Sequence, residues 1–323
     1  KTAANIRQEL KEEIESLAKS HNGIVPGLAV VLVGNRVDSA TYVRMKKKAA
    51  VEIGIHSIDV TLPTTISQDD LKAEIEKLNQ DPKVHGILVQ LPLPDHIKES
   101  EVLKAISYTK DADGFSAQNI GNMWLGRGTG DPPLAIPCTP AGCIDLLQRY
   151  EIDITGKECV VLGRSNIVGM PVAALLQSCN GTVVTGCHSR TKNIPEIIGR
   201  VDVFIADIGK TEYVRGEWLK PGVVIVDASI NDKPDATKKR GYRLVGDVHY
   251  EEALEKASVI TPVPGGVGPM TIAMLMKNTV NLCRRSLGLP RLQLRNKTHR
   301  NLSHRDFVHI NNHTPAIACQ QTG

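Results

Sequence analysis

Residues 159–171 read CVVLGRSNIVGMP and join an apolar run to a loop that opens a helix. The apolar run predicts a buried strand at 159–162, and the residues after the loop predict a helix at 171–177. A loop in this position offers free backbone N–H groups and the positive end of a helix to a phosphate. Gly163 and Gly169 are spaced more widely than the glycines of GxGxxG, so this stretch alone leaves open both a nucleotide site and a plain strand-to-helix turn.

The second half of the chain continues this pattern of strands and helices. Further strands are expected at 182–185, 201–205, 223–226 and 259–260, and a helix is expected from about Thr139. The succession has the proportions of a Rossmann-like dinucleotide-binding domain with a mostly parallel sheet.

The first half alternates in the same way. Ile6, Leu10, Ile14 and Leu17 recur at helical spacing, and the run at 28–33 is apolar throughout, as in a buried strand. Further elements are expected as helices at 39–53 and 68–79 and strands at 58–62 and 86–91. A polar loop at 110–137 separates the halves, and a last helix at 270–287 closes the pattern. The fold class is therefore α/β, with two α/β domains.

Composition and charge narrow the choice of partners. Aromatic residues make up 3% of the chain, which argues against nucleic-acid modules that stack bases. The net charge of +4 arises at the end of the chain, because residues from Arg284 onward carry +6 and the remainder sums to −2. The tail at 290–323 has no convincing period and is expected to be disordered, with no nucleic-acid partner.

The seven cysteines are odd in number and include no paired CxxC spacing, so they are expected to be reduced and mostly buried, without a metal site. No run approaches the ~20 apolar residues of a membrane span, and no secretory leader is visible. These features predict a cytoplasmic protein without a membrane partner. An organelle stays open, because the chain starts at Lys1 and a targeting peptide could have been removed.

Two groups of side chains favour NADP as the nucleotide. Arg164 and Ser165 in the loop supply donors suited to an additional phosphate. After the next strand come residues 188–191, which include Ser189 and Arg190, at the place where a Rossmann fold discriminates the ribose. No Asp or Glu stands there to bond a free 2′-hydroxyl, as NAD would require.

Residues 262–271 read PVPGGVGPMT, with three glycines between three prolines. Proline fixes φ and glycine lets the backbone approach a ligand, so the stretch is typical of a rigid wall that contacts something flat or phosphorylated. A tight turn before the following helix is the alternative.

Polar residues in the first half are candidates for a second site. Tyr42 and Lys46 are four apart on a predicted helix, so a ring and an ammonium share one face; a solvated basic face is the alternative. Gln90 interrupts an apolar strand and indicates a polar pocket, unless it is a satisfied structural glutamine. Asp111 and Asp113 could bind donors on a ligand or form an Asx turn.

Taken together, these segments resemble the bifunctional methylenetetrahydrofolate dehydrogenase/methenyltetrahydrofolate cyclohydrolase family over nearly everything from Ile6 to Leu287. The motifs that carry the resemblance are Ser39, Tyr42, Val43 and Lys46, VQLPLP at 89–94, KDADGF at 110–115, PCTPAG at 137–142, GRSNIVGMP at 163–171, His188, Ser189 and Thr191, GDV at 246–248, and PVPGGVGPMT at 262–271.

The resemblance implies a homodimer in which tetrahydrofolate derivatives bind in a cleft between two α/β domains. Residues 1–138 would form the folate-binding catalytic domain, joined by the returning helix 270–287, and 139–269 the NADP-binding domain. The implied reactions are NADP-dependent oxidation of 5,10-methylenetetrahydrofolate to 5,10-methenyltetrahydrofolate and its hydrolysis to 10-formyltetrahydrofolate. The first step needs alignment more than a strong base, and the second needs proton transfer.

The resemblance also implies roles for individual residues. Lys46 would be the acid/base group of the hydrolysis, Tyr42 would stack on the folate, Gln90 would hydrogen-bond Lys46, and Asp113 would bind the pterin. Pro262, Gly265 and Gly266 would line the cleft. The cofactor would contact Gly163, Arg164, Ser165, Ile167, Gly169, Ser189, Arg190 and Ile230.

The chain departs from the family pattern in its second half. Asp207 stands at a usually small, apolar position beside the cofactor, Thr211 replaces a proline, and Ser229 replaces a glycine. A carboxylate near the nicotinamide would favour its cationic oxidised form, whereas a carboxylate near a phosphate would repel it, so cofactor affinity is the property in question. Two alternatives therefore stay open: a monofunctional cyclohydrolase with an impaired nucleotide site, and a nucleotide-binding scaffold whose basic tail contacts an acidic partner.

Overall fold

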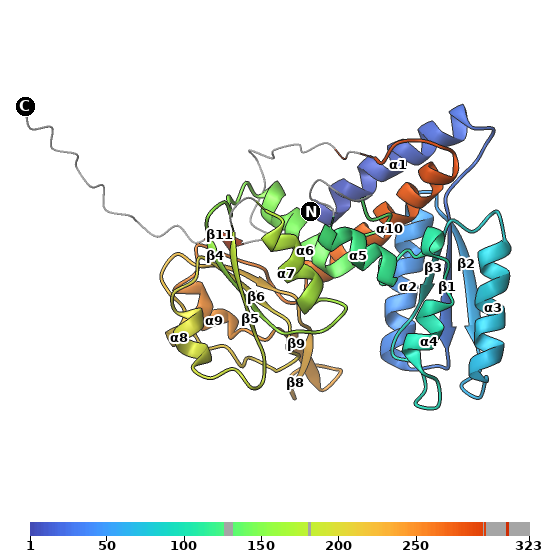
Figure 1. Ribbon diagram of the computed structural model, residues 1–323. Coiled ribbons are helices and arrows are strands. Elements are labelled where there is room, and N and C mark those ends of the chain that lie inside the picture. The colour runs from blue at the N-terminus through green and yellow to red at the C-terminus, as the bar shows by residue number, and fades with distance from the viewer. Residues whose placement is uncertain (126–131, 180–181, 293, 295–307, 310–323) are drawn as a thin grey trace, which may run out of the picture.

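The computed structural model describes residues 1–125, 132–179, 182–292, 294 and 308–309, which form two α/β units (Figure 1). The first unit is built on a parallel three-stranded sheet in the order β2-β1-β3. Its strands are β1 (Gly27–Val33), β2 (His56–Leu62) and β3 (Gly86–Val89). All seven residues of the central strand β1 are buried, which explains why that run is apolar throughout.

The helical segments of the first unit lie before, between and after these strands in the chain. They are α1 (Thr2–Ser20), α2 (Val37–Glu52), α3 (Gln68–Gln80), α4 (Glu99–Lys104), the short 3-10 helix η1 (Tyr108–Lys110) and α5 (Ala117–Leu125). The four apolar residues of α1 that recur at helical spacing are all buried, as the sequence predicts. Helix α3 begins after Ser67, whose hydroxyl accepts a hydrogen bond from the amide of Asp70, and it buries Leu71 and Ile75 against the sheet.

The second unit contains a six-stranded sheet in the order β11-β10-β7-β6-β4-β5. Its strands are β4 (Glu158–Leu162), β5 (Val183–Cys187), β6 (Val203–Ala206), β7 (Val224–Asp227), β10 (Val259–Ile260) and β11 (Val308–His309). All pairs are parallel except β10 with β11. Strand β4 lies between β5 and β6, so the strand order reverses there, and ligands of such sheets bind at the carboxyl ends of the strands that flank the reversal.

Shorter elements complete the second unit. Its helices are α6 (Cys138–Arg149), α7 (Gly169–Gln177), α8 (Ile194–Ile198), η2 (Gly216–Trp218) and α9 (Tyr250–Leu254). The strands β8 (Asn231–Pro234) and β9 (Tyr242–Val245) form a separate antiparallel hairpin.

The last helix, α10 (Val267–Ser286), returns the chain to the first unit. It packs against α1 and α2 of the first unit and α6 of the second (Figure 1). The Asn278 side chain on α10 donates hydrogen bonds to the carbonyls of Ala112 at 2.9 Å and Ile136 at 2.8 Å. This helix therefore fixes the segment that connects the two units.

The expected elements are present with shifted ends, and some elements were not expected. The loop predicted at 110–137 contains α5, and the strand predicted at 86–91 ends at Val89, so Gln90 lies just beyond the strand. Most of the tail predicted to be disordered lies outside the described residues; within the described part, Leu292 and Leu294 pack against the core and 308–309 form β11. Among helices of the described residues, none is long and apolar enough to cross a membrane.

Candidate active site between the two domains

A pocket of about 380 Å³ lies where the two units meet. The first unit contributes Lys46 and Gln90, the second contributes Val168 and Ile230, and the start of α10 contributes Thr271. The remaining lining residues are Tyr42, Val89, Leu91, Asp113, Phe115, Cys138, Thr139, Ile167, Ala228, Gly268 and Ile272. A flat ligand bound here would contact both units.

Lys46 is held in place by the amide of Gln90. Its Nζ donates to Gln90 Oε1 at 2.9 Å, and Gln90 Nε2 donates to the carbonyl of Leu91 at 2.7 Å. Both ends of the amide therefore have partners, which fixes the face that it presents to the lysine. Tyr42 lies one turn before Lys46 on α2 and is 41% exposed, while the neighbouring Lys47 forms an ion pair with Asp59 instead.

The two carboxylates after η1 have different environments. Asp111 is 3% exposed, and its oxygens accept hydrogen bonds from the amides of Gly114 and Ser116 and from the side chain of Asn119. Asp111 therefore shapes the loop, in the manner of the Asx turn that was one reading of the sequence. Asp113 lines the pocket instead, with Oδ1 3.9 Å from the sulfur of Cys138.

Burial raises the pKa of Asp113 to about 6, and the charge of Asp111 adds to this, whereas the Lys46 ammonium opposes it. The carboxyl is therefore ionised above pH 6 and accepts hydrogen bonds from N–H groups of a ligand. As the pH falls through 6, it becomes protonated and loses this capacity.

For the tetrahydrofolate that the resemblance implies, we expect binding to the wild-type protein to weaken progressively as the pH falls from 7.5 to 5. At pH 7.5 we expect Asp113→Asn to bind about tenfold more weakly than the wild type, because a charge-assisted hydrogen bond is lost. The affinity of this variant should not change between pH 7.5 and 5. Fluorescence titration at each pH measures both. A wild-type affinity that stays constant through pH 6 would contradict a ligand-binding role for Asp113.

A second pocket, of about 260 Å³, lies at the carboxyl ends of β4 and β6 where the strand order reverses. Gly163 and Arg164 follow β4, His188 and Ser189 follow β5, and Asp207 follows β6. Ile208, Lys210 and Tyr213 add to its wall, with Leu162 and Ile194. This is the position at which a doubly wound sheet binds a dinucleotide.

The two glycines of the loop at 163–169 leave no room for a side chain. Gly163 has a φ of +136°, and a Cβ there would lie 2.1 Å from the carbonyl oxygen of Asp207. A Cβ on Gly169 would lie 2.5 Å from the carbonyl oxygen of Gly163. The loop is thus a close-packed backbone surface that leads into the first turn of α7, which suits a pyrophosphate.

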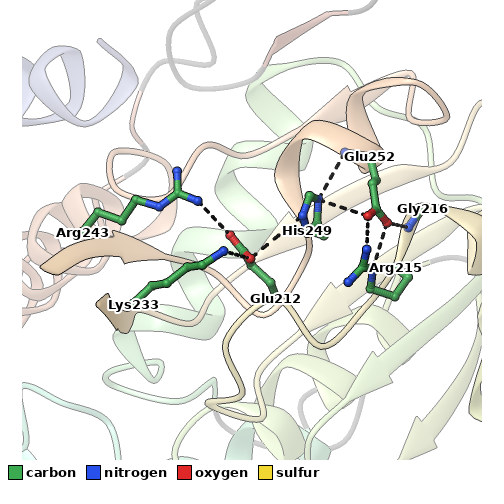
Figure 2. Close-up of polar contacts among 7 residues, drawn as sticks. All are labelled: Glu212, Arg215, Gly216, Lys233, Arg243, His249 and Glu252. Atoms are coloured by element: carbon green, nitrogen blue, oxygen red, sulfur yellow. Dashed lines mark hydrogen bonds and ion pairs between the residues drawn. The ribbon is translucent and has the colours of Figure 1, made fainter. Parts of the chain in front are cut away.

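A network of charged side chains holds the segment that follows β6 (Figure 2). Glu212, whose φ is +47°, forms ion pairs with Lys233 on β8 and with Arg243 on β9, the latter at 3.5 Å. His249 lies between Glu212 and Glu252, and Glu252 in turn pairs with Arg215 and accepts from the amide of Gly216 at 2.9 Å. The network anchors both sides of Tyr213, which lines the second pocket.

Most of the site residues predicted from the sequence line one of the two pockets. Tyr42, Lys46, Gln90 and Asp113 share the interdomain pocket. Ile167 and Ile230, expected at the cofactor, line that pocket as well, whereas Gly163, Arg164 and Ser189 line the second pocket.

Other predicted residues lie beside these walls. Ser165 hydrogen-bonds to Asp207, and Gly169 begins α7. The amide of Arg190 donates to His188 Nδ1 at 3.2 Å, but its side chain is not on the wall of either pocket. Pro262, Gly265 and Gly266 precede Gly268, the first residue of their stretch on the interdomain wall.

Several wall residues were missed by the sequence reading. Ala228, Lys210 and Tyr213 lie outside the motifs quoted from the sequence, whereas Val168 and Thr271 lie inside two of these motifs but were given no role of their own. His188 lines the second pocket and belongs to the segment at 188–191 that the sequence places at the ribose, although it was not among the predicted cofactor contacts.

Comparison with known proteins agrees with this geometry. Residues 1–113 match the catalytic domain of the tetrahydrofolate dehydrogenase/cyclohydrolase family, and residues 137–287 match its NAD(P)-binding domain. The "Bifunctional protein FolD 4, chloroplastic" of Arabidopsis thaliana is 53% identical over 283 residues, which are 88% of this chain and 77% of the relative. The "Bifunctional protein FolD" of Acetivibrio thermocellus is 52% identical and covers 87% of this chain and 94% of its own.

A solved structure gives the same result. The Trypanosoma brucei N5,N10-methylenetetrahydrofolate dehydrogenase-cyclohydrolase, complexed with NADP cofactor and an inhibitor, superposes with a TM-score of 0.84 at 41% identity, covering 88% of this chain and 96% of the other. The matches reach both units and span the pocket between them. This chain belongs to the tetrahydrofolate dehydrogenase/cyclohydrolase family.

Proposed function

We propose that this chain is a bifunctional folate enzyme that oxidises 5,10-methylenetetrahydrofolate with NADP and hydrolyses the resulting 5,10-methenyltetrahydrofolate to 10-formyltetrahydrofolate. The observation that carries the proposal is the pocket in which Lys46, Gln90 and Asp113 of the first unit face the nucleotide loop of the second. A scaffold protein would need none of these three side chains.

In the hydrolysis, Lys46 transfers protons at its Nζ. Water attacks the methenyl carbon, and the protons that leave the water and reach the ring nitrogen must be carried by a group within hydrogen-bond reach. Gln90 Oε1 accepts one hydrogen of the Lys46 ammonium, so the other ammonium hydrogens of Lys46 can face the substrate. Asp113 accepts from N–H groups of the pterin, and Tyr42 supplies a ring at the pocket mouth on which the folate stacks.

In the oxidation, the protein aligns and shields the reacting groups. NADP, when bound, supplies the acceptor for the hydride of the methylene carbon. The glycine-tight loop at 163–169 fits its pyrophosphate, and Arg164 and Ser189 stand where an additional phosphate on the ribose would lie. Ile167, Ile230 and Thr271 line the pocket and exclude water between the two ligands. We propose that Pro262, Gly265 and Gly266, which precede Gly268 on that wall, complete the cleft.

We propose domain boundaries, assembly and location in line with this function. Residues 1–138 together with 270–287 form the folate-binding domain, and 139–269 the NADP-binding domain, in a homodimer. We propose a cytoplasmic or organellar location; the relatives include a chloroplastic protein. A cyclohydrolase with a weakened nucleotide site is the second candidate, because the Asp207 carboxylate occupies a donor of the nucleotide loop, Ser165, at 2.9 Å.

A two-part assay of the purified protein tests the proposal. With 5,10-methylenetetrahydrofolate, we expect absorbance from reduced cofactor to appear with NADP and more slowly with NAD. With 5,10-methenyltetrahydrofolate and no nucleotide, we expect its absorbance to disappear. Hydrolysis without oxidation would favour the monofunctional cyclohydrolase. The absence of both activities would overturn the proposal.

A further inference from the structure

The nucleotide pocket contains a carboxylate of the protein itself, that of Asp207. This residue directly follows β6 at the point where the strand order reverses, and its carbonyl oxygen is the atom that keeps Gly163 free of a side chain. Its side chain bends back onto the nucleotide loop, where Oδ2 accepts a hydrogen bond from the hydroxyl of Ser165 at 2.9 Å.

Ser165 and Gly169 connect this carboxylate to the donors of the loop. The Ser165 hydroxyl oxygen accepts from the amides of Val168 and Gly169, both at 3.1 Å. The Gly169 amide also stabilises the Asp207 carboxylate. Asp207 therefore takes up the Ser165 hydroxyl, a donor of the loop that leads into α7 and that would otherwise be available to a bound anion.

The charges around Asp207 do not fix its ionisation. Burial raises its pKa to about 6, and the buried Asp247 adds to this, while the bonds from Ser165 and Gly169 act in the opposite direction. On the pocket side, Arg164 and Lys210 are cationic and His188 is titratable. None of these three makes an ion pair with Asp207 among the described residues, so the carboxylate is held by neutral donors.

We propose that the Asp207 carboxyl competes with the dinucleotide for the donors of the loop at 163–169, so that binding of the dinucleotide is coupled to uptake of a proton by Asp207. The inference depends on the proposed nucleotide site and adds a control on its affinity. Two like charges at one set of donors repel each other, and protonation of the carboxyl removes the repulsion.

The direction of the pH effect follows from the ionised form being the one that repels. Below pH 6, Asp207 is neutral and the dinucleotide binds at full strength. As the pH rises through 6, the carboxyl ionises in the free protein, and binding must then bring a proton with it. Affinity therefore falls as the pH rises, by up to tenfold for each pH unit until the pKa of the bound form is reached.

Equilibrium dissociation constants for NADP and for NAD, measured by isothermal titration calorimetry between pH 5.5 and 8.0, test the coupling. The 2′-phosphate of NADP titrates near pH 6, as does a histidine, so the informative quantity is the ratio of wild-type to variant Kd at each pH. Asp207→Ala and Asp207→Asn remove the charge. Asp232→Asn removes an exposed carboxylate of β8 as a matched control.

We expect the ratio of wild-type Kd to Asp207→Ala Kd to be near one at pH 5.5 and about ten at pH 8.0. The same ratio for Asp207→Asn should change with pH in the same way. The Kd of Asp232→Asn should equal that of the wild type at every pH. A buffer-dependent heat that reports proton uptake should accompany binding to the wild type only. A ratio that is constant with pH overturns the coupling. If no variant binds NADP at any pH while methenyltetrahydrofolate is still hydrolysed, both this inference and the proposed dehydrogenase fail.

Discussion

Lys46→Met is expected to lower the hydrolysis of 5,10-methenyltetrahydrofolate by about 10²- to 10⁴-fold, the usual contribution of a positioned acid/base group. Methionine keeps the length and flexibility of the side chain but has no proton to transfer. Lys46 lies on α2, across the interdomain pocket from the nucleotide loop, so the Kd for NADP should stay within twofold of wild type. Stopped-flow loss of methenyl absorbance measures the first quantity and calorimetry the second.

Two further variants separate the roles of Lys46. Lys47→Met removes the neighbouring ammonium, which pairs with Asp59, and should leave hydrolysis unchanged. Lys46→Arg keeps a positive charge beside Asp113 but cannot give up its proton, so it should bind folate well and hydrolyse it slowly. Hydrolysis at the wild-type rate in Lys46→Met would remove this lysine from the mechanism.

Gly163→Ala is expected to weaken NADP binding by at least about tenfold and to remove most of the dehydrogenase activity. The new Cβ would lie 2.1 Å from the Asp207 carbonyl oxygen, and alanine rarely adopts a φ of +136°. A residue held in such a region costs on the order of 1–3 kcal/mol before the contact with the Asp207 carbonyl is counted. The backbone must therefore shift at the loop that meets the pyrophosphate.

The hydrolysis of methenyltetrahydrofolate without nucleotide shows whether the Gly163→Ala protein is folded. Gly186→Ala is a suitable control, because Gly186 lies on the adjacent strand β5 and has nothing within 4 Å of the added carbon. We expect it to bind NADP as the wild type does. Equal Kd values for Gly163→Ala and wild type would mean that NADP does not contact this loop.

Much of the fold follows from local signals in the sequence. Runs such as 28–33 and 159–162 are apolar because both faces of a parallel strand are covered, and the spacing in α1 follows from its single buried face. Helix α5 was hidden because residues 110–137 are polar and contain glycine, and its buried Asn119 is stabilised by Asp111 and by the amides of Leu134 and Ala135. Such long-range hydrogen bonds leave no periodic trace.

The site was less predictable than the fold. The pairing of Lys46 with Gln90 joins residues 44 apart, and only the resemblance to a family suggested it. Only the resemblance singled out Asp113 from Asp111, because their roles depend on which backbone amides surround them and the residues alone do not show this. Asp207 stood out as a departure from the family, but its bond to Ser165 required three-dimensional structure.

The chain enters and leaves the second unit at neighbouring points. Helix α6 begins that unit and α10 leaves it, and the hydroxyls of Thr139 and Thr271 at these two points lie 2.9 Å apart. Gly142 allows the helices to approach, because a Cβ there would lie 3.0 Å from the Cβ of Met270. The second unit is thus a domain inserted into the first at a single place. Replacing it with another dinucleotide-binding domain would keep the two ends of the first unit at the same separation.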